Sequence, residues 1–300
     1  MIKSVEEVLN NMQIQRPMPT GMKFLDEHLG GFYPGELTVV CGGSDCGKTA
    51  LIIRLIHSIA FDNEAPVLVV LNNMSERSFL ACMAAYYCSV VIHDVNQVFF
   101  HPVCMEMVES YLNELKKKPI YLEDKSGLLG RGEEELRQNI KEKGIKFLFY
   151  EYNKYEDSLP LEGPMIGYKL KSMAKELQVA VILEYHMSCM YESRPSLLDV
   201  GNDSLARYAD NIIVLGEPEK RGIYKDENGN STRGMVSLDI IKHKGMISTD
   251  KGVSFRKIML YSRSRERAML AEAKEVIEAN PNIQKLIGRF GCEVVSELPE

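Results

Sequence analysis

The sequence has no apolar run that approaches the ~20 residues of a membrane-spanning helix. Its first residues, Met1 to Glu7, lack the apolar stretch of a secretory signal peptide. Its seven cysteines, an odd number, include no C-x-x-C pair, which argues against a zinc framework or a disulfide scaffold. These absences predict a cytoplasmic protein with reduced thiols and no membrane partner.

An excess of positive charge is also absent. The formal net charge of −6 argues against a protein that coats nucleic acid, although a local basic groove is compatible with it. The sequence has no low-complexity tract and no internal repeat. Its 300 residues suffice for one large α/β domain or two small ones.

What the sequence does contain is a complete phosphate-binding loop, G-x-x-x-x-G-K-[ST]. The loop and the residue that follows it are Gly42, Gly43, Ser44, Asp45, Cys46, Gly47, Lys48, Thr49 and Ala50. An apolar strand over residues 36–41 precedes the loop and a helix over residues 50–56 follows it. Because this context lets backbone N–H groups and the helix dipole converge on phosphate, a chance glycine turn is the weaker interpretation.

The residue types in the loop predict a nucleoside triphosphate and Mg²⁺ as the ligands. Lys48 would reach the β- and γ-phosphates, and the Thr49 hydroxyl would bind Mg²⁺. Cys46 has two interpretations, an oxidation-sensitive thiol whose pKa falls at a helix N-terminus or a small residue that fills the loop. We favour the second.

Strand and helix patterns alternate through the first two thirds of the chain. Apolar strands are predicted over residues 37–41, 67–71, 119–122, 145–150, 179–183 and 211–215. Helices are predicted over residues 48–60, 75–88, 103–117, 132–143 and 164–177. Continuous apolar strands separated by helices predict an α/β fold with a mostly parallel central sheet covered on both faces.

The two ends of the chain have other patterns. A short amphipathic helix over residues 4–12 and a proline-containing linker to residue 19 open the sequence, and the helix could fold back or dock on a neighbouring subunit. After residue 216 the sequence predicts a β-rich extension and then a helical tail. The predicted strands cover 222–224, 235–241 and 253–261, a hairpin turn covers 226–230, and the helices cover 264–280 and 283–290.

Several further motifs occur together with the phosphate loop. They are Pro19-Thr20-Gly21, Leu25-Asp26, Leu29-Gly30-Gly31, Pro34-Gly35-Glu36-Leu37, Asn73-Met74-Ser75, Leu170 to Ile182, Arg194 to Asp199, Tyr208 to Asn211 and Ile240 to Gly245. In order, over about residues 17–262, they resemble the RecA-like P-loop motor domain of DnaB-type replicative helicases. The match over Leu170 to Ile182 speaks against a general recombinase or a clock-type ATPase. The family's N-terminal collar domain has no counterpart in this sequence.

The resemblance implies a domain organisation and an assembly. Residues 1–18 would form a linker helix and arm, residues 19–262 the RecA-like ATPase domain, and residues 263–300 a C-terminal helical tail. The linker helix would dock on the adjacent subunit of a homo-oligomeric ring, expected to be a hexamer, with ATP sites at the interfaces. Single-stranded DNA and replication proteins are the partners that the family implies.

The resemblance also assigns catalytic positions. Glu151 stands where the family has its Mg²⁺-supporting Asp, and Asn73 where it has its water-activating Glu. His186 aligns with the family's sensor glutamine. Lys242 keeps its family identity. Lys244 replaces an arginine that acts on the neighbour's site, and this change retains the positive charge but loses the planar fork of the guanidinium group.

These departures leave two functions open. Because an amide cannot accept a proton, Asn73 predicts slow hydrolysis unless Glu76, about one helical turn away, replaces the missing carboxylate. The segments 153–164 and 188–207, which correspond to the family's DNA-binding loops, are both net acidic and therefore weaken the case for DNA binding without removing it. The first hypothesis is a DNA-stimulated motor. The second is a nucleotide-gated assembly or loading module that hydrolyses ATP slowly or not at all.

Overall fold

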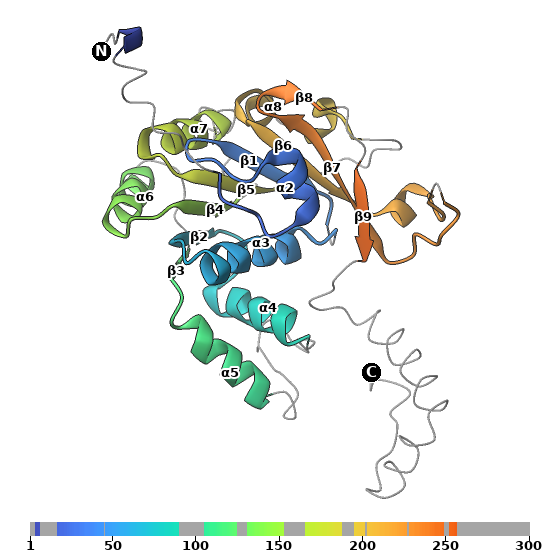
Figure 1. Ribbon diagram of the computed structural model, residues 1–300, viewed down its shortest axis with the longest axis horizontal. Coiled ribbons are helices and arrows are strands. Elements are labelled where there is room, and N and C mark those ends of the chain that lie inside the picture. Colours follow the sequence, from blue (N-terminus) through green and yellow to red (C-terminus); the bar gives the residue numbers. More distant parts are fainter. Residues whose placement is uncertain are drawn as a thin grey trace, which may run out of the picture.

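The computed structural model describes residues 4–6, 17–44, 46–89, 105–124, 131–152, 166–187, 195–201, 203–226, 228–248 and 252–256. Its centre is a nine-stranded sheet in the order β3-β2-β4-β5-β1-β6-β7-β8, with β9 also paired to β7 (Figure 1). The strands from β3 to β6 in this order are all parallel, which confirms the predicted α/β class. The expected helices over residues 4–12 and 264–290 lie largely or wholly outside the described residues.

The six parallel strands are the six that their apolar runs predict. They are β1 (Leu37–Gly42), β2 (Val67–Leu71), β3 (Ile120–Asp124), β4 (Phe147–Glu151), β5 (Ala180–His186) and β6 (Asn211–Gly216). Every residue of β1, β2 and β6 is buried, as expected where helices cover both faces of a parallel sheet.

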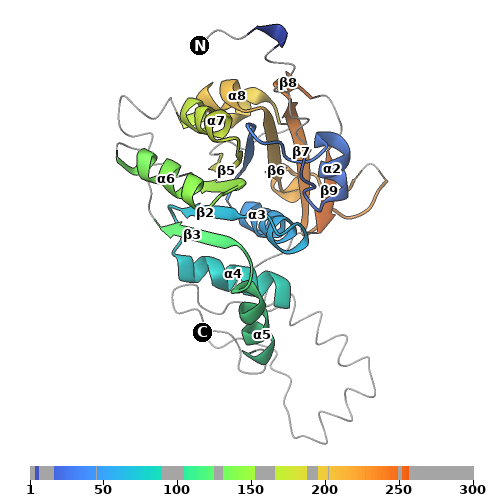
Figure 2. The ribbon, with the colours of Figure 1, turned by 60° about the vertical axis from the view of Figure 1, so that its left-hand side comes forward.

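Helices cover the two faces of the sheet separately (Figure 2). The described helices are α2 (Lys23–Leu29), α3 (Lys48–His57), α4 (Glu76–Cys88), α5 (Met105–Leu115), α6 (Arg131–Glu142), α7 (Ile166–Leu177) and α8 (Asp203–Tyr208). Along β1, Leu37, Val39 and Cys41 pack in the core under α6 and α7, while Val40 packs in the core under α3 and α4. This alternation follows from the two-residue period of a strand and gives the domain two hydrophobic cores.

The β-rich extension is confirmed in part. Strand β7 (Met235–His243) runs antiparallel to β6, and β8 (Met246–Ile247) and β9 (Val253–Arg256) pair with β7. The strand predicted over 222–224 is wrong, because none of these residues is in a strand, and the nearest pairing is an isolated bridge between Lys225 and Ser231. The turn between those two residues is held by Asp226, whose carboxylate accepts hydrogen bonds from the backbone of Asn228 and Asn230.

Several short elements were not expected from the sequence. Helix α2 buries only Leu25 and Leu29 and is capped by Gly30. The apolar pattern that could have predicted this helix is therefore a single i, i+4 pair. The predicted helix 48–60 ends as an α-helix at His57 and continues as a π-helical turn, η1 (Ser58–Asp62). Two 3₁₀ turns, η5 (Leu197–Val200) and η6 (Pro218–Arg221), flank α8 and β6. Within the described residues, no helix has the length and apolarity that a bilayer span needs.

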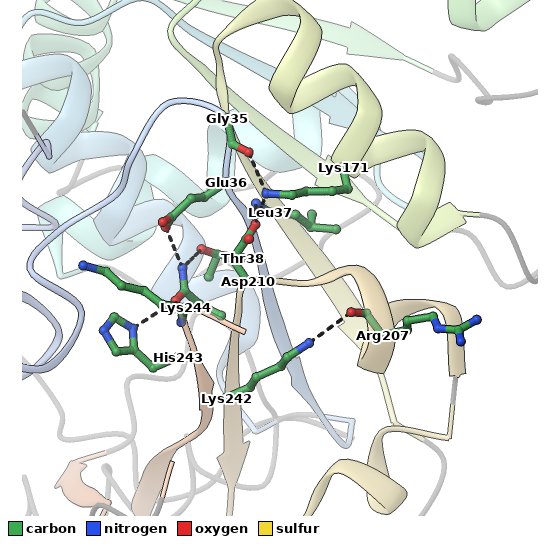
Figure 3. A network of polar contacts seen from close by, with 11 residues as sticks. Gly35, Glu36, Leu37, Thr38, Lys171, Arg207, Asp210, Lys242, His243 and Lys244 are labelled. Atoms are coloured by element: carbon green, nitrogen blue, oxygen red, sulfur yellow. Dashed lines mark hydrogen bonds and ion pairs between the residues drawn. The ribbon is translucent and has the colours of Figure 1, made fainter. Parts of the chain in front are cut away.

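A polar network ties the N-terminal edge of the parallel strands together (Figure 3). The Asp210 carboxylate accepts the Leu37 backbone N–H at 2.7 Å and pairs with Lys171 at 2.5 Å. Lys171 also donates to the Gly35 carbonyl at 2.8 Å. Because these side chains are largely buried, the network joins the start of β1, helix α7 and the start of β6 in a place where unpaired charges would be costly.

We predict that Asp210→Ala lowers the free energy of unfolding by about 2–4 kcal/mol, because it leaves the Lys171 ammonium without its negative partner and the Leu37 N–H without its acceptor. Urea unfolding followed by circular dichroism measures this loss. Glu114→Ala is the matched control, because Glu114 pairs with Lys117 at 2.7 Å with both side chains more than half exposed. An exposed pair stabilises little, so the control should unfold at the wild-type urea concentration. Equal effects of the two substitutions would contradict a structural role for the network.

Candidate nucleotide site

The phosphate loop lies at the carboxyl end of β1 and leads into helix α3, as predicted. Gly47, the last residue before α3, has a left-handed backbone with φ 89°, which disfavours a side chain there. A Cβ on Gly42 would overlap the Leu215 carbonyl oxygen and approach the Cys46 sulfur. Both glycines are therefore required by the path of the backbone, which brings N–H groups to the N-terminus of α3. Asp45 lies outside the described residues.

Cys46 fills the base of the loop. Its side chain is buried, and its sulfur lies 4.0 Å from the Lys48 ammonium. Burial raises the pKa of the Cys46 thiol, although the charge of Lys48 opposes this effect. The fall in pKa that a helix N-terminus favours is thus overcome, and the packing role is the better interpretation.

Lys48 and Thr49 lie at the start of α3 next to a carboxylate that the sequence reasoning did not identify. The Lys48 ammonium donates to the Gly43 carbonyl at 2.7 Å, within the loop itself. The Thr49 hydroxyl donates to the Glu184 carboxylate, with 3.1 Å between the two oxygens. Glu184 lies on β5, two residues before His186. A charged residue near the carboxyl end of an otherwise buried parallel strand is the signal that could have revealed it.

Glu151 ends β4, as expected, but contacts the turn between β2 and α4. Its Oε2 accepts the backbone N–H groups of Asn72 at 3.0 Å and Asn73 at 2.9 Å. The Asn72 side chain returns a hydrogen bond to the Glu151 carbonyl, and the Asn73 amide donates to the Tyr152 carbonyl at 2.8 Å. The Asn73 side chain is therefore engaged with the end of β4.

The two glutamates are neighbours in the sheet. Glu151 and Glu184 are partners in the parallel register of β4 and β5, so their side chains leave the same face. The pKa of Glu184 is raised to about 7, mainly by burial and also by the nearby Glu151 charge, although the Lys48 charge and the Thr49 hydrogen bond oppose this shift. Both carboxylates line one cavity beside Thr49, whose other walls include Met74, Phe79 and Phe149.

These residues fit a magnesium ion. Mg²⁺ prefers hard oxygen ligands and is normally held by one or two protein groups together with phosphate and water. The Thr49 hydroxyl lies against the Glu184 carboxylate at the helix N-terminus where phosphate would bind, so the required oxygen atoms are present. The described part of the chain contains no cluster of three or more His, Cys, Asp or Glu side chains suited to a metal, and thus no all-protein metal cage.

The remaining predicted residues lie at opposite ends of the parallel strands. His186 ends β5 and is in register with Gly42, so it lies at the loop. Lys242, by contrast, is in register with Ile212 at the start of β6, whereas Gly42 pairs with Leu215 near the end of that strand. Because β7 is antiparallel, Lys242 and the following Lys244 lie at the edge away from their own phosphate loop.

Lys242 and Lys244 have intramolecular contacts there (Figure 3). The Lys242 ammonium is buried and donates to the carbonyls of Ala206 and Arg207 at the end of α8, and burial lowers its pKa. The Lys244 ammonium lies 4.9 Å from the centre of the Tyr33 ring, and its backbone N–H donates to Asn211. Glu76 is exposed in the first turn of α4. Residues 153–165 and 188–194, which include much of the two predicted DNA-binding loops, lie outside the described residues.

Comparison with known proteins confirms the resemblance. The family model for the DnaB-like helicase C-terminal domain matches residues 17–260. Replicative DNA helicase DnaB of Buchnera aphidicola subsp. Schizaphis graminum is 27% identical over 251 residues, which cover 77% of this chain and 52% of that protein. Replicative DNA helicase DnaC of Bacillus subtilis is 22% identical over 262 residues, which cover 80% of this chain and 58% of that protein. The chain thus spans about half the length of the curated relatives it matches.

Solved structures share the fold. One solved ATPase domain superposes with a TM-score of 0.66 at 20% identity, over 85% of this chain and 95% of that one. A DnaB-like replicative helicase, solved in a study of its interactions with primase, gives a TM-score of 0.66 at 21% identity over 84% of this chain and 62% of that one. The predicted RecA-like P-loop core is therefore confirmed at the level of the fold.

The raised pKa of Glu184 predicts a pH-dependent stability. A carboxyl whose pKa is higher in the folded than in the unfolded protein stabilises fully below its ordinary value of 4.5, and this contribution is lost as the pH rises through about 7. Glu184→Gln, a neutral mimic of the protonated acid, should therefore be more stable than the wild type at pH 8 by about 1–3 kcal/mol and equal to it near pH 4.5.

Thermal unfolding in the presence of a chelator and without nucleotide measures this difference. Glu135→Gln, at an exposed carboxylate of α6, is the control and should follow the wild type at both pH values. A Glu184→Gln variant that is no more stable than the wild type at pH 8 would show that the carboxylate is well solvated.

Proposed function

The chain belongs to the DnaB-like helicase C-terminal domain family, and we propose that it is an ATP- and Mg²⁺-binding motor domain that acts on single-stranded DNA in replication or recombination. The observation that carries the proposal is the phosphate loop at the start of α3, with Lys48 beside Gly43 and the Thr49 hydroxyl against a carboxylate. When bound, Mg²⁺ would neutralise charge on the phosphates. The chain's own groups would bind and orient them.

The placement of Lys242 and Lys244 supports an oligomeric ring. Both residues lie at the edge of the sheet away from the phosphate loop of the same subunit, so neither serves that loop without a large rearrangement. In a head-to-tail ring, that edge can face the nucleotide of the next subunit. Lys244 is the better candidate for this role, because the Lys242 ammonium is held by two carbonyls at the end of α8.

We propose that hydrolysis is slow compared with relatives that carry a glutamate at the position of Asn73. The Asn73 amide cannot take a proton from water, and it donates to the Tyr152 carbonyl. Positioned acid–base groups contribute about 10²–10⁴-fold to a rate, which sets the scale of the loss. Single-stranded DNA would bind along the loops that follow β4 and β5, where backbone N–H groups can contact phosphates despite the acidic side chains.

The Asn73 amide, which cannot take a proton from water, also favours a second function. If ATP binds without useful turnover, the domain would act as a nucleotide-gated assembly or loading module of a replication complex. Nucleotide would then stabilise the contact between subunits by mass action, provided that it binds the assembled site more tightly than the separate subunit.

Phosphate release with and without single-stranded DNA separates the two functions. The motor predicts DNA-stimulated turnover of at least about 1 per second, within the usual enzyme range. Lys48→Ala should abolish both turnover and any ATP-dependent assembly measured by mass photometry, whereas Lys116→Ala, at an exposed lysine that donates to Asn113, should not. Tight ATP binding without turnover supports the assembly module, and unchanged ATP-dependent assembly in Lys48→Ala contradicts both functions.

Lys244 gives a second prediction. Lys244→Ala should bind ATP like the wild type, because the residue lies away from its own phosphate loop, but should lose at least about tenfold in turnover, a conservative estimate for loss of a cation supplied by a neighbour. Lys244→Arg, which restores the planar fork of the family, should match or exceed the wild-type rate. Fluorescence binding and phosphate release measure the two effects. Full turnover by Lys244→Ala would argue against a role at the neighbour's site.

A further inference from the structure

Two carboxylates lie at the nucleotide site, and their contacts differ. We propose that Glu184, rather than Glu151, is the protein carboxylate that completes the Mg²⁺ site with Thr49, and that Glu151 positions the turn after β2. This inference rests on the proposed nucleotide site and departs from the assignment that the family resemblance implies. It concerns residues on adjacent strands that the sheet brings into register.

The order of the strands places Glu184 nearer to the phosphate loop. In the sheet, β5 lies directly between β4 and β1, and β1 leads into the loop. A side chain near the carboxyl end of β5 is therefore one strand closer to Thr49 than the corresponding side chain of β4. The contact between Thr49 Oγ1 and Glu184 Oε1, 3.1 Å long, is the result.

The contacts of Glu151 assign it a different task. One of its carboxylate oxygens accepts two backbone N–H groups, those of Asn72 and Asn73, which fix the path of the chain from β2 toward α4. The side chains of both asparagines then bond to carbonyls at the end of β4. The result is a closed set of hydrogen bonds between two strand ends. Moving Glu151 toward a metal would break the two N–H contacts.

The charges of the pair favour a cation between them and the phosphates. Like charges directly opposite each other on neighbouring strands destabilise a sheet. Lys48 is the positive group whose charge acts on Glu184, and in the proposed complex it would reach the nucleotide phosphates instead of the Gly43 carbonyl. A divalent ion held by Thr49 and Glu184 would replace that compensation.

The test compares the metal dependence of nucleotide binding, which needs no turnover. The affinity for N-methylanthraniloyl-ATP is measured by fluorescence with MgCl₂ and with EDTA for the wild type, Glu184→Gln and Glu151→Gln. Glu184→Gln should keep the wild-type affinity in EDTA. Its ratio of affinities in Mg²⁺ and EDTA should be at least about tenfold smaller than that of the wild type, which is the scale found when metal-supporting groups are removed. Glu151→Gln should retain most of this gain. Glu184→Asp, which keeps the charge on a shorter arm, should fall between.

The outcomes separate this inference from the proposed function. If Glu184→Gln keeps the wild-type ratio of affinities in Mg²⁺ and EDTA, or if Glu151→Gln loses it, Glu184 is not the metal-supporting carboxylate. If the wild type binds the fluorescent nucleotide in neither buffer, the nucleotide site itself is wrong. Electron paramagnetic resonance of Mn²⁺ in the presence of ADP is an independent readout. Bound Mn²⁺ should fall in Glu184→Gln and persist in Glu151→Gln, and the reverse pattern would overturn the inference.

Discussion

The parallel order β4-β5-β1 is the constraint on which the site depends. Because parallel strands end at the same edge, this order gathers the loop after β1, Glu184 on β5 and Glu151 on β4 within one row of the sheet. The hydrogen bond from Thr49 to Glu184 is the direct consequence, since it joins the first turn of α3 to the strand beside β1. A different strand between β4 and β1 would leave the loop and its helix unchanged but would remove the carboxylate from the Thr49 hydroxyl.

The opposite edge of the sheet is organised by a second polar group. Asp210 joins β1, α7 and β6. The Asn211 side chain accepts the backbone N–H of Lys244 and donates to the Thr38 hydroxyl. The antiparallel direction of β7 ends its strand at this edge, which is why the two lysines of the Ile240 to Gly245 motif lie far from their own phosphate loop. The separation is built into the topology. It makes the nucleotide site of a single chain incomplete if those lysines act on phosphate.

Sequence patterns predicted the six parallel strands and the phosphate loop, because buried apolar runs and the glycine spacing are local signals. They missed α2, whose buried face is only Leu25 and Leu29, and they misassigned 222–224 as a strand, because a short run beside a turn pairs only if a partner strand is within reach. The contact of Glu184 with Thr49 was beyond local reasoning for a different reason. It depends on which strands are neighbours, and residues 49 and 184 are brought together only by the whole sheet.

Asn73, Glu151 and Glu184 form one connected set, because Glu151 accepts the Asn73 N–H and is the register partner of Glu184. The family resemblance assigns carboxylates to the positions of Asn73 and Glu151, whereas this chain has an amide at the first of them and a further carboxylate at Glu184. Two acidic groups therefore lie at the phosphate site, one on β4 and one on β5. A glutamate at position 73 could not donate to the Tyr152 carbonyl as the amide does, and it would add a third negative charge beside Glu151. Restoring that glutamate alone would thus place a third carboxylate against the existing pair, so its effect on hydrolysis would depend on the charge of Glu184 as well.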